Sequence, residues 1–219
     1  MKERVFAAFA LLFAPIGGMA SASETISFTV GDVKFTAIAP EGYCIPKGED
    51  EIFAAEVAIQ DTSSFTSLTL IRCDLAGEER GYDVDFLVIK TPFRLLSAIK
   101  SREELLGSLS AQMGKPDWEI NREMDGVPNQ IADTMSRNFA TAVSVEGTIR
   151  PRGVDSICAY LGGKLTGAGG SGLMGSCVTS VDGKVMTIHS YGLADGSQSV
   201  ENLMRRSRAV ALSIKRVAP

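Results

Sequence analysis

The first twenty-two residues constrain this chain most, because they indicate where it folds and which covalent bonds its fold can contain. Lys2 and Arg4 precede a short apolar run, and Ala20-Ser21-Ala22 then has the small-x-small pattern of a signal-peptide cleavage site. We therefore predict a signal peptide over residues 1–22 and a mature chain that starts at Ser23. The protein is expected to be periplasmic or secreted, by export of the Gram-negative type.

An uncleaved membrane anchor is the alternative interpretation of this segment. Its apolar run, Val5–Ile16, is broken by Pro15 and is followed by Gly17-Gly18. A membrane-spanning helix needs roughly 20 apolar residues, which this run does not supply. We therefore expect no transmembrane span after signal cleavage, and a single domain over residues 23–219, which is long enough to bury a substantial core.

Four cysteines, Cys44, Cys73, Cys158 and Cys177, are an even number in an exported chain, where disulfides persist. None of their spacings is C-x-x-C, so neither a redox pair of that type nor a zinc ribbon is indicated. Four cysteines allow three connectivities. If the chain turns at Gly167-Ala168, Cys158 lies opposite Cys177, and Cys44 pairs with Cys73 by elimination. We predict these two disulfides.

Several strands are indicated by apolar residues and tight turns. Gly31-Asp32 is a Gly-first turn that divides residues 26–39 into a hairpin, and Asp182-Gly183 is a strong hairpin signal near the C-terminus. Residues 68–75 and 84–91 are apolar at both parities, as expected for strands covered on both faces. A further strand is expected at 156–161.

Helical spacing marks the other elements. Ser101 and Glu104 form a capping box before apolar residues at helical spacing, so a helix is predicted from there to Gly114. Weaker patterns predict helices at 49–60 and 129–140. One apolar stripe predicts a long final helix, on which we expect the chain to end: Val200, Leu203, Met204, Ser207, Val210, Ala211 and Ile214. This element order predicts an α+β fold with a mainly antiparallel sheet and helices packed on it.

The charge is unevenly distributed. The whole chain carries a formal net charge of −4, whereas a general nucleic-acid binder would be basic, so no nucleic-acid partner is expected. Residues 147–219, however, carry nine basic and four acidic side chains. Either this excess complements the acidic remainder within the fold, or it forms a basic face that binds an envelope protein or an anionic envelope component. The candidate residues are Arg205, Arg206 and Arg208, with Lys215 and Arg216.

The glycine-rich segment 162–175 contains a dinucleotide-binding pattern, G-x-G-x-x-G, at Gly167–Gly172. That function requires the motif to open a helix whose amides bind the pyrophosphate. Here the sequence continues as a strand from Leu173, and a nicotinamide cofactor is not expected outside the cytoplasm. We predict a glycine-rich hairpin, flexible and able to approach a partner closely, and no cofactor.

His189 is the only histidine, so any catalytic imidazole must be this one. A two-residue turn at Asp182-Gly183 pairs it with Ser176 on one face of a hairpin. A hydroxyl beside an imidazole can be half of a nucleophile–base pair, but a triad also needs a carboxylate and an oxyanion hole, which no motif marks. A small envelope hydrolase using His189 with Ser176 is thus the alternative function, and a structural histidine is the other interpretation.

Asp83 and Asp85 share one face at a strand entry, with Glu78 and Glu79 just before them. Calcium binds such oxygen clusters, but the spacing matches no calcium loop, and solvated acids are common at strand ends. A single histidine also excludes a site with several imidazole ligands. We therefore expect no metal site, and we interpret Trp118 as a core side chain.

The element order resembles one known family. Residues Phe35 to Tyr43 read F-x-x-x-x-P-E-G-Y, and the C-terminal third combines aromatic-ended hairpin strands, a glycine-containing turn and a final amphipathic helix. Together they resemble the PsbP-like fold of photosystem extrinsic proteins and bacterial periplasmic relatives. The resemblance implies an α-β-α sandwich that docks to larger assemblies without catalysis, whereas the four cysteines and the long glycine segment depart from it. We therefore expect an exported, non-enzymatic binding or accessory protein.

Overall fold

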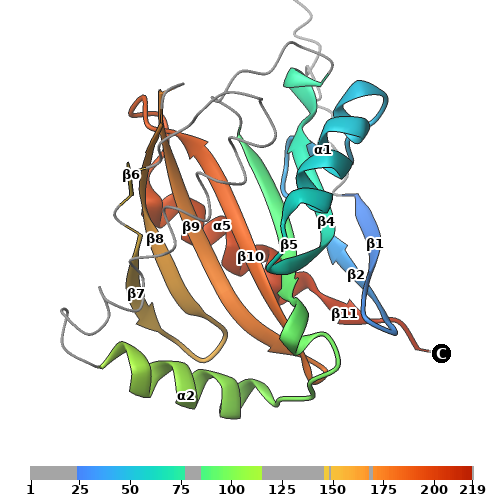
Figure 1. The fold of residues 1–219 in the computed structure, drawn as a ribbon, viewed down its shortest axis with the longest axis vertical. Coiled ribbons are helices and arrows are strands. Elements are labelled where there is room, and N and C mark those ends of the chain that lie inside the picture. The colour runs from blue at the N-terminus through green and yellow to red at the C-terminus, as the bar shows by residue number, and fades with distance from the viewer. Residues whose placement is uncertain (1–23, 77–84, 115–145, 148, 168–169, 219) are drawn as a thin grey trace, which may run out of the picture.

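The computed structural model describes residues 24–76, 85–114, 146–147, 149–167 and 170–218 (Figure 1). Several features of the sequence lie outside these residues: the signal peptide over 1–22, the helix predicted at 129–140, Glu78, Glu79, Asp83 and Trp118. Within the part that is described, no helix is long and apolar enough to cross a membrane.

The larger of two sheets has eight strands in the order β3-β4-β5-β10-β9-β8-β6, with β7 also pairing with β8. All of these pairs are antiparallel. The strands are β3 (Tyr43–Cys44), β4 (Ser64–Arg72), β5 (Phe86–Pro92), β6 (Glu146–Gly147), β7 (Arg150–Val154), β8 (Ala159–Gly167), β9 (Gly170–Val181) and β10 (Lys184–Leu193). Short 3-10 turns follow β4 at Cys73–Leu75 and β5 at Phe93–Leu95.

The smaller sheet has the order β1-β2-β11. Strands β1 (Thr25–Val30) and β2 (Val33–Ile38) form the predicted hairpin, and Gly31 has the positive φ of 61° that its turn requires. The chain does not end on its last helix, as the sequence suggested. It continues into β11 (Lys215–Arg216), which pairs with the open edge of β2 and so satisfies backbone groups that a hairpin alone leaves unpaired.

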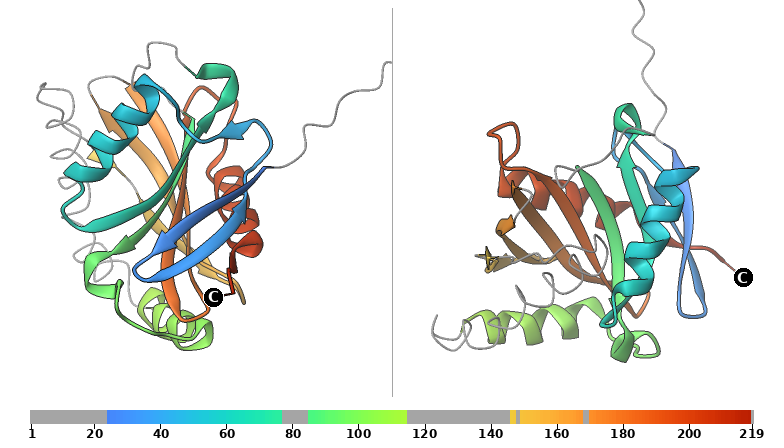
Figure 2. Two further views of the ribbon diagram at one scale, coloured as in Figure 1. Left: turned by 90° about the vertical axis from the view of Figure 1, so that its right-hand side faces the viewer. Right: turned by 45° about the horizontal axis from the view of Figure 1, so that its top comes forward.

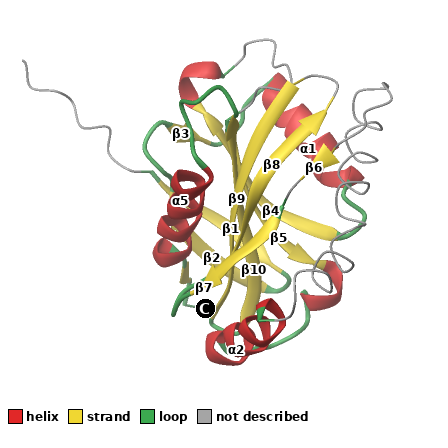
Figure 3. Cartoon of the chain, turned by 90° about the vertical axis from the view of Figure 1, so that its left-hand side faces the viewer, coloured by secondary structure: helices red, strands yellow, loops and turns green. Residues whose placement is uncertain are grey.

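Helices lie on both sides of the larger sheet, so the α+β prediction and its α-β-α layering are confirmed (Figures 2 and 3). Helix α5 (Val200–Ser213) packs on one face, and α1 (Glu49–Gln60) runs in front of β4 on the other. Helix α2 (Arg102–Met113) crosses one end of the sheet, and its Ser101–Glu104 capping box forms as predicted. One apolar core joins both sheets to α5, through residues such as Phe35, Ile188 and Val210.

The glycines of β8 and β9 form the surface on which α5 packs. A Cβ atom at Gly175 would lie 2.5 Å from the Met204 nitrogen and 2.6 Å from the Leu203 Cβ, and one at Gly162 would lie 2.4 Å from Val200 Cγ1. Only glycine allows the helix so close to the sheet. The expectation of a flexible, partner-facing hairpin therefore needs correction at these two positions, which are buried against α5.

The disulfide Cys158–Cys177 is present, with the two Cα atoms 5.1 Å apart. The register that predicted it was wrong. Gly167 pairs with Gly170, so Cys177 lies opposite Tyr160, and Cys158 is two residues away, just outside β8. Glycine-rich strands specify their register weakly, which explains the error. The diagonal neighbour of a strand pair still lies close enough to form the bond.

Candidate functional site

The Asp182-Gly183 turn places Ser176 directly opposite His189, as its length predicted. Both turn residues have positive φ, 47° and 84°, as in a type I′ turn. The backbone twist of this turn type matches the right-handed twist of the two strands that it connects. Ser176 Oγ and His189 Nδ1 lie 2.7 Å apart and form a hydrogen bond. The structure thus brings together the only hydroxyl–imidazole pair that the sequence singled out.

The surroundings of this pair do not favour catalysis. Ser176 is fully buried, so its hydroxyl is closed to a substrate. Burial, together with the charge of Lys90, lowers the pKa of His189 to about 3, and an imidazole with so low a pKa is a weak general base. Asp61 pairs with Lys90 at 2.7 Å, and within the described residues no carboxylate hydrogen-bonds to the ring. The pair therefore lacks the orienting acid of a triad.

Asp85 lies in a buried cluster of protein side chains. It accepts hydrogen bonds from the Tyr43 hydroxyl and from Arg206 Nη1, the latter at 2.7 Å, and Arg72 Nη1 is 3.7 Å away. The Arg206 guanidinium also lies over the Tyr43 ring, 4.9 Å from its centroid. Burial and then the Asp85 hydrogen bond raise the pKa of Tyr43 above its usual range. Arginine and tyrosine donors thus surround the carboxylate that the sequence considered as a calcium ligand.

The three arginines of α5 do not share one outward face. Arg206 turns toward β3–β5 and its Asp85 partner, whereas Arg208 turns toward β7 and β8, where its Nε lies 2.9 Å from Asp155. Arg205 is the most exposed of the three, and it contacts Asn202 in the preceding turn. The helical rotation that buries Leu203 and Ser207 determines these directions. Part of the C-terminal charge therefore complements the fold from within.

Other basic side chains lie on the same side of the sheet as α5. Arg150 pairs with Gly162, whose missing side chain faces α5, so the two residues share that face. Lys164 follows two residues later with the same parity. Arg150, Lys164 and Arg205 are exposed, and Arg208 is 39 % exposed. We call these four residues the basic surface. Its signal in the sequence was the excess of basic residues after residue 147, which did not reveal which of them lie on the same side of the sheet.

Asp155 organises one end of the basic surface. Its carboxylate accepts hydrogen bonds from the backbone amides of Cys158 and Ile157 and from the Tyr160 hydroxyl, besides Arg208. Burial acts to raise the pKa of Asp155, but these donors outweigh it and lower the pKa to about 2. The Tyr160 hydroxyl is affected in the opposite direction, since burial and the interaction with Asp155 raise the pKa of Tyr160 to about 12. Sequence reasoning did not identify Asp155.

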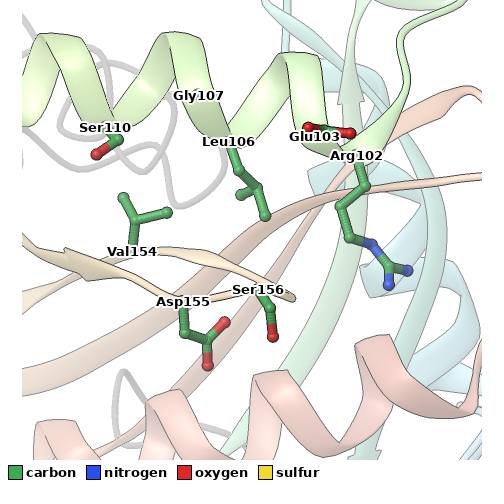
Figure 4. A pocket seen from close by; sticks show the side chains of 8 residues that line it. All are labelled: Arg102, Glu103, Leu106, Gly107, Ser110, Val154, Asp155 and Ser156. Carbon is green, nitrogen blue, oxygen red and sulfur yellow. The ribbon is translucent and has the colours of Figure 1, made fainter.

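An open groove of about 540 Å³ separates α2 from β7 and the turn that follows it (Figure 4). Leu106 and Val154 supply its apolar part, while the Asp155 side chain points away toward α5. The polar groups do not converge on one point, so we assign the groove no ligand. Its lining residues are Arg102, Glu103, Leu106, Gly107, Ser110, Val154, Asp155 and Ser156.

Cys44 and Cys73 carry free thiols in the structure, so the second disulfide expected by elimination is not formed there. The two side chains are nevertheless close enough for Cys73 to perturb the Cys44 thiol. Burial, followed by the interaction with Cys73, raises the pKa of Cys44 to about 11.

Comparison with known proteins gives a structural similarity. No protein-family model matches the chain, and no curated protein matches it either. Among solved structures it is similar to the solution structure of cyanobacterial PsbP (CyanoP) from Synechocystis sp. PCC 6803. The identity is 17%, the TM-score is 0.41, and the match covers 94% of this chain and 99% of that one. This is the family that the sequence resembles; a similarity of this extent carries no conclusion about function.

Proposed function

We propose that this protein is an exported, non-enzymatic accessory protein that binds an acidic protein of the cell envelope through its basic surface. The observation that carries the proposal is the exposure of Arg150, Lys164 and Arg205 on the face that α5 occupies. Two neighbouring strands, β7 and β8, and the later helix α5 contribute these cations. An exposed group of like charges attracts a surface of opposite charge. Export rests on the signal-peptide pattern of residues 1–22.

Charge pattern favours a protein partner over a lipid surface. Asp155 and Glu201 lie among the basic residues, the first paired with Arg208 and the second one helical turn before Arg205. Membrane attraction grows with the number of uninterrupted Lys and Arg residues near the surface, at about 1 kcal/mol each. A surface of mixed sign suits a partner whose own charges are placed to match it.

The chemistry of the Ser176–His189 pair supports a non-enzymatic role. A hydrolase needs a reachable nucleophile and an imidazole that accepts a proton near neutral pH. Here Ser176 is buried and the pKa of His189 is lowered to about 3. The hydrogen bond instead joins β9 to β10 within the sheet.

A charge-reversal experiment tests the docking proposal. The variant R150E/K164E/R205E is compared with K34E/K47E/R94E, whose side chains are also exposed but lie on β2, before α1 and after β5. Both variants change the net charge equally, so only position differs. Each mature protein is crosslinked in its native envelope, and the captured proteins are quantified by mass spectrometry.

We expect an acidic envelope protein to be captured by the wild type and the control, and to be lost from R150E/K164E/R205E and at high salt. Equal capture by both variants would overturn the proposal. Binding of the wild type to phosphatidylglycerol vesicles, without a protein partner, would instead indicate a lipid surface. Mass spectrometry of protein recovered from its host tests export: the chain should begin at Ser23, and an intact Met1–Ala22 in the cytoplasm contradicts it.

A further inference from the structure

The two free thiols lie where β3 meets the end of β4. Cys44 ends the two-residue strand β3 and pairs with Ile71, and Cys73 begins the 3-10 turn directly after β4. The Cys73 amide donates to the Gly42 carbonyl at 2.9 Å, which holds the backbones together beyond the last ladder pair. These backbone contacts hold the two cysteines at neighbouring positions across the strand pair.

The closed disulfide provides a comparison within the same chain. Cys158 and Cys177 are both fully buried, and Cys158 lies two residues from the direct partner of Cys177, just outside a strand. Cys73 has the same offset of two from Ile71, the direct partner of Cys44, and also lies just outside a strand. The main difference is access, because Cys73 is exposed and Cys44 is half-buried.

From this arrangement we propose that Cys44 and Cys73 are a reversible, redox-responsive disulfide site, whereas Cys158–Cys177 is a permanent structural bond. Exposed thiols exchange with disulfides in solution, while a buried bond is closed to reductants until the protein unfolds. This inference is independent of the proposed docking function, since it concerns β3 and β4 and uses none of the basic surface.

The two cysteines take different parts in the reaction. The exposed Cys73 thiolate attacks one sulfur of a small-molecule or protein disulfide, and the other sulfur of that donor leaves as a thiolate. Cys44 then loses its proton to solvent and attacks the Cys73 sulfur, which expels the second donor thiolate. Two thiols are oxidised to one disulfide, and their two protons pass through solvent to the two donor thiolates, so the donor disulfide is reduced to two thiols. Reaction with a dithiol reverses every step.

Closing this bond encloses α1 and β4 in one covalent loop, because both elements lie between the two cysteines. It also ties down Tyr43, the neighbour of Cys44, whose hydroxyl donates to Asp85. The oxidised state should therefore hold β3 on β4 more firmly than the reduced state. Helix α1 makes a suitable reporter because it lies inside this loop and has an exposed face, on which the Ile59 side chain is 81 % exposed.

Native thiol counting tests the site directly. The mature protein is treated with dithiothreitol or with oxidised glutathione, alkylated without denaturant, and mapped by mass spectrometry. We expect alkylation at Cys44 and Cys73 alone after dithiothreitol, and at no cysteine after glutathione, with a Cys44–Cys73 linked peptide. Hydrogen exchange of residues 49–60 should be slower in the oxidised protein.

Two matched variants test the order of attack. In Cys44→Ser, Cys73 should form a stable mixed disulfide with glutathione, because the resolving thiol is gone. In Cys73→Ser, Cys44 should react at least about tenfold more slowly, since its thiolate is disfavoured. Either variant retains the buried Cys158–Cys177 bond as an internal control for folding.

Three results would overturn the proposal. Thiols of the wild type that stay free in oxidised glutathione would show that the geometry cannot close. A Cys44–Cys73 bond that dithiothreitol opens only on unfolding would make it structural. A wild type that accumulates the mixed disulfide at Cys73, as Cys44→Ser should, would show that Cys44 does not resolve it.

Discussion

Arg206 and Asp85, which are 121 residues apart in the sequence, form a partly buried ion pair with 2.7 Å between Nη1 and Oδ1. The pair joins the final helix to the entrance of β5, and Tyr43 completes it from β3. Neither side chain has more than 17 % of its surface exposed. Removing Arg206 should therefore leave the poorly solvated Asp85 charge with only the more distant Arg72, at 3.7 Å, and the Tyr43 hydroxyl to compensate it.

Replacing Arg206 should for this reason be far more harmful than replacing its neighbour. We expect Arg206→Ala to lower the free energy of unfolding by about 3 kcal/mol, the order found for a broken buried pair. Arg205→Ala, at an exposed position, should change it by less than about 0.5 kcal/mol. Urea unfolding measures both. Adding Asp85→Asn to Arg206→Ala should restore part of the loss, and equal effects of the two arginines would contradict the structure.

The single histidine gives an unambiguous pH experiment. Since the pKa of His189 is lowered to about 3, its ring signals in an NMR titration should not move between about pH 5 and pH 8. The unfolded chain takes up this proton near pH 6.5. Unfolding therefore binds a proton, and stability should fall as pH drops from about 6.5 toward 3. His189→Gln should remove this pH dependence of stability. A ring that titrates near pH 6.5 would instead show that the imidazole of His189 is exposed to solvent.

Two glycines provide a matched packing test. Gly175→Ala should lower the free energy of unfolding by at least about 1 to 3 kcal/mol, because its methyl group would overlap the backbone of α5. Gly107→Ala lies in helix α2 with open space around it, and should raise stability by roughly 0.5 to 1 kcal/mol through helix propensity. Thermal unfolding of both variants measures these two changes in stability. A neutral Gly175→Ala would mean that α5 does not pack this closely.

Asp155 makes an acid-dependent contribution to stability. Its pKa is lowered to about 2 in the fold, so its contribution is complete above the unfolded value near 3.9 and is lost as pH falls through the folded value. The stability difference between wild type and Asp155→Asn should therefore shrink between about pH 4 and pH 2. Urea unfolding across this range measures it. A difference that stays constant would show that the carboxylate charge is not involved.

Local signals in the sequence were sufficient for the elements whose geometry depends on neighbouring residues. The capping box at Ser101 and Glu104 begins α2, and Asp182-Gly183 pairs Ser176 with His189. Both predictions succeed because the geometry of a cap or of a two-residue turn is determined by the few residues that form it. The resemblance to the PsbP-like fold likewise rested on the order of such elements.

Longer-range relations were decided by packing. The turn between β8 and β9 falls one residue later than proposed, because several glycines offer equivalent turns and only the fit of α5 against Gly162 and Gly175 selects one. The same fit sets the rotation of α5, which sends Arg206 to Asp85 and Arg208 to Asp155. An amphipathic pattern marks which face of a helix is buried, but not what the flanking charges meet. Residues 121 positions apart become partners only when the sheet that separates them has formed.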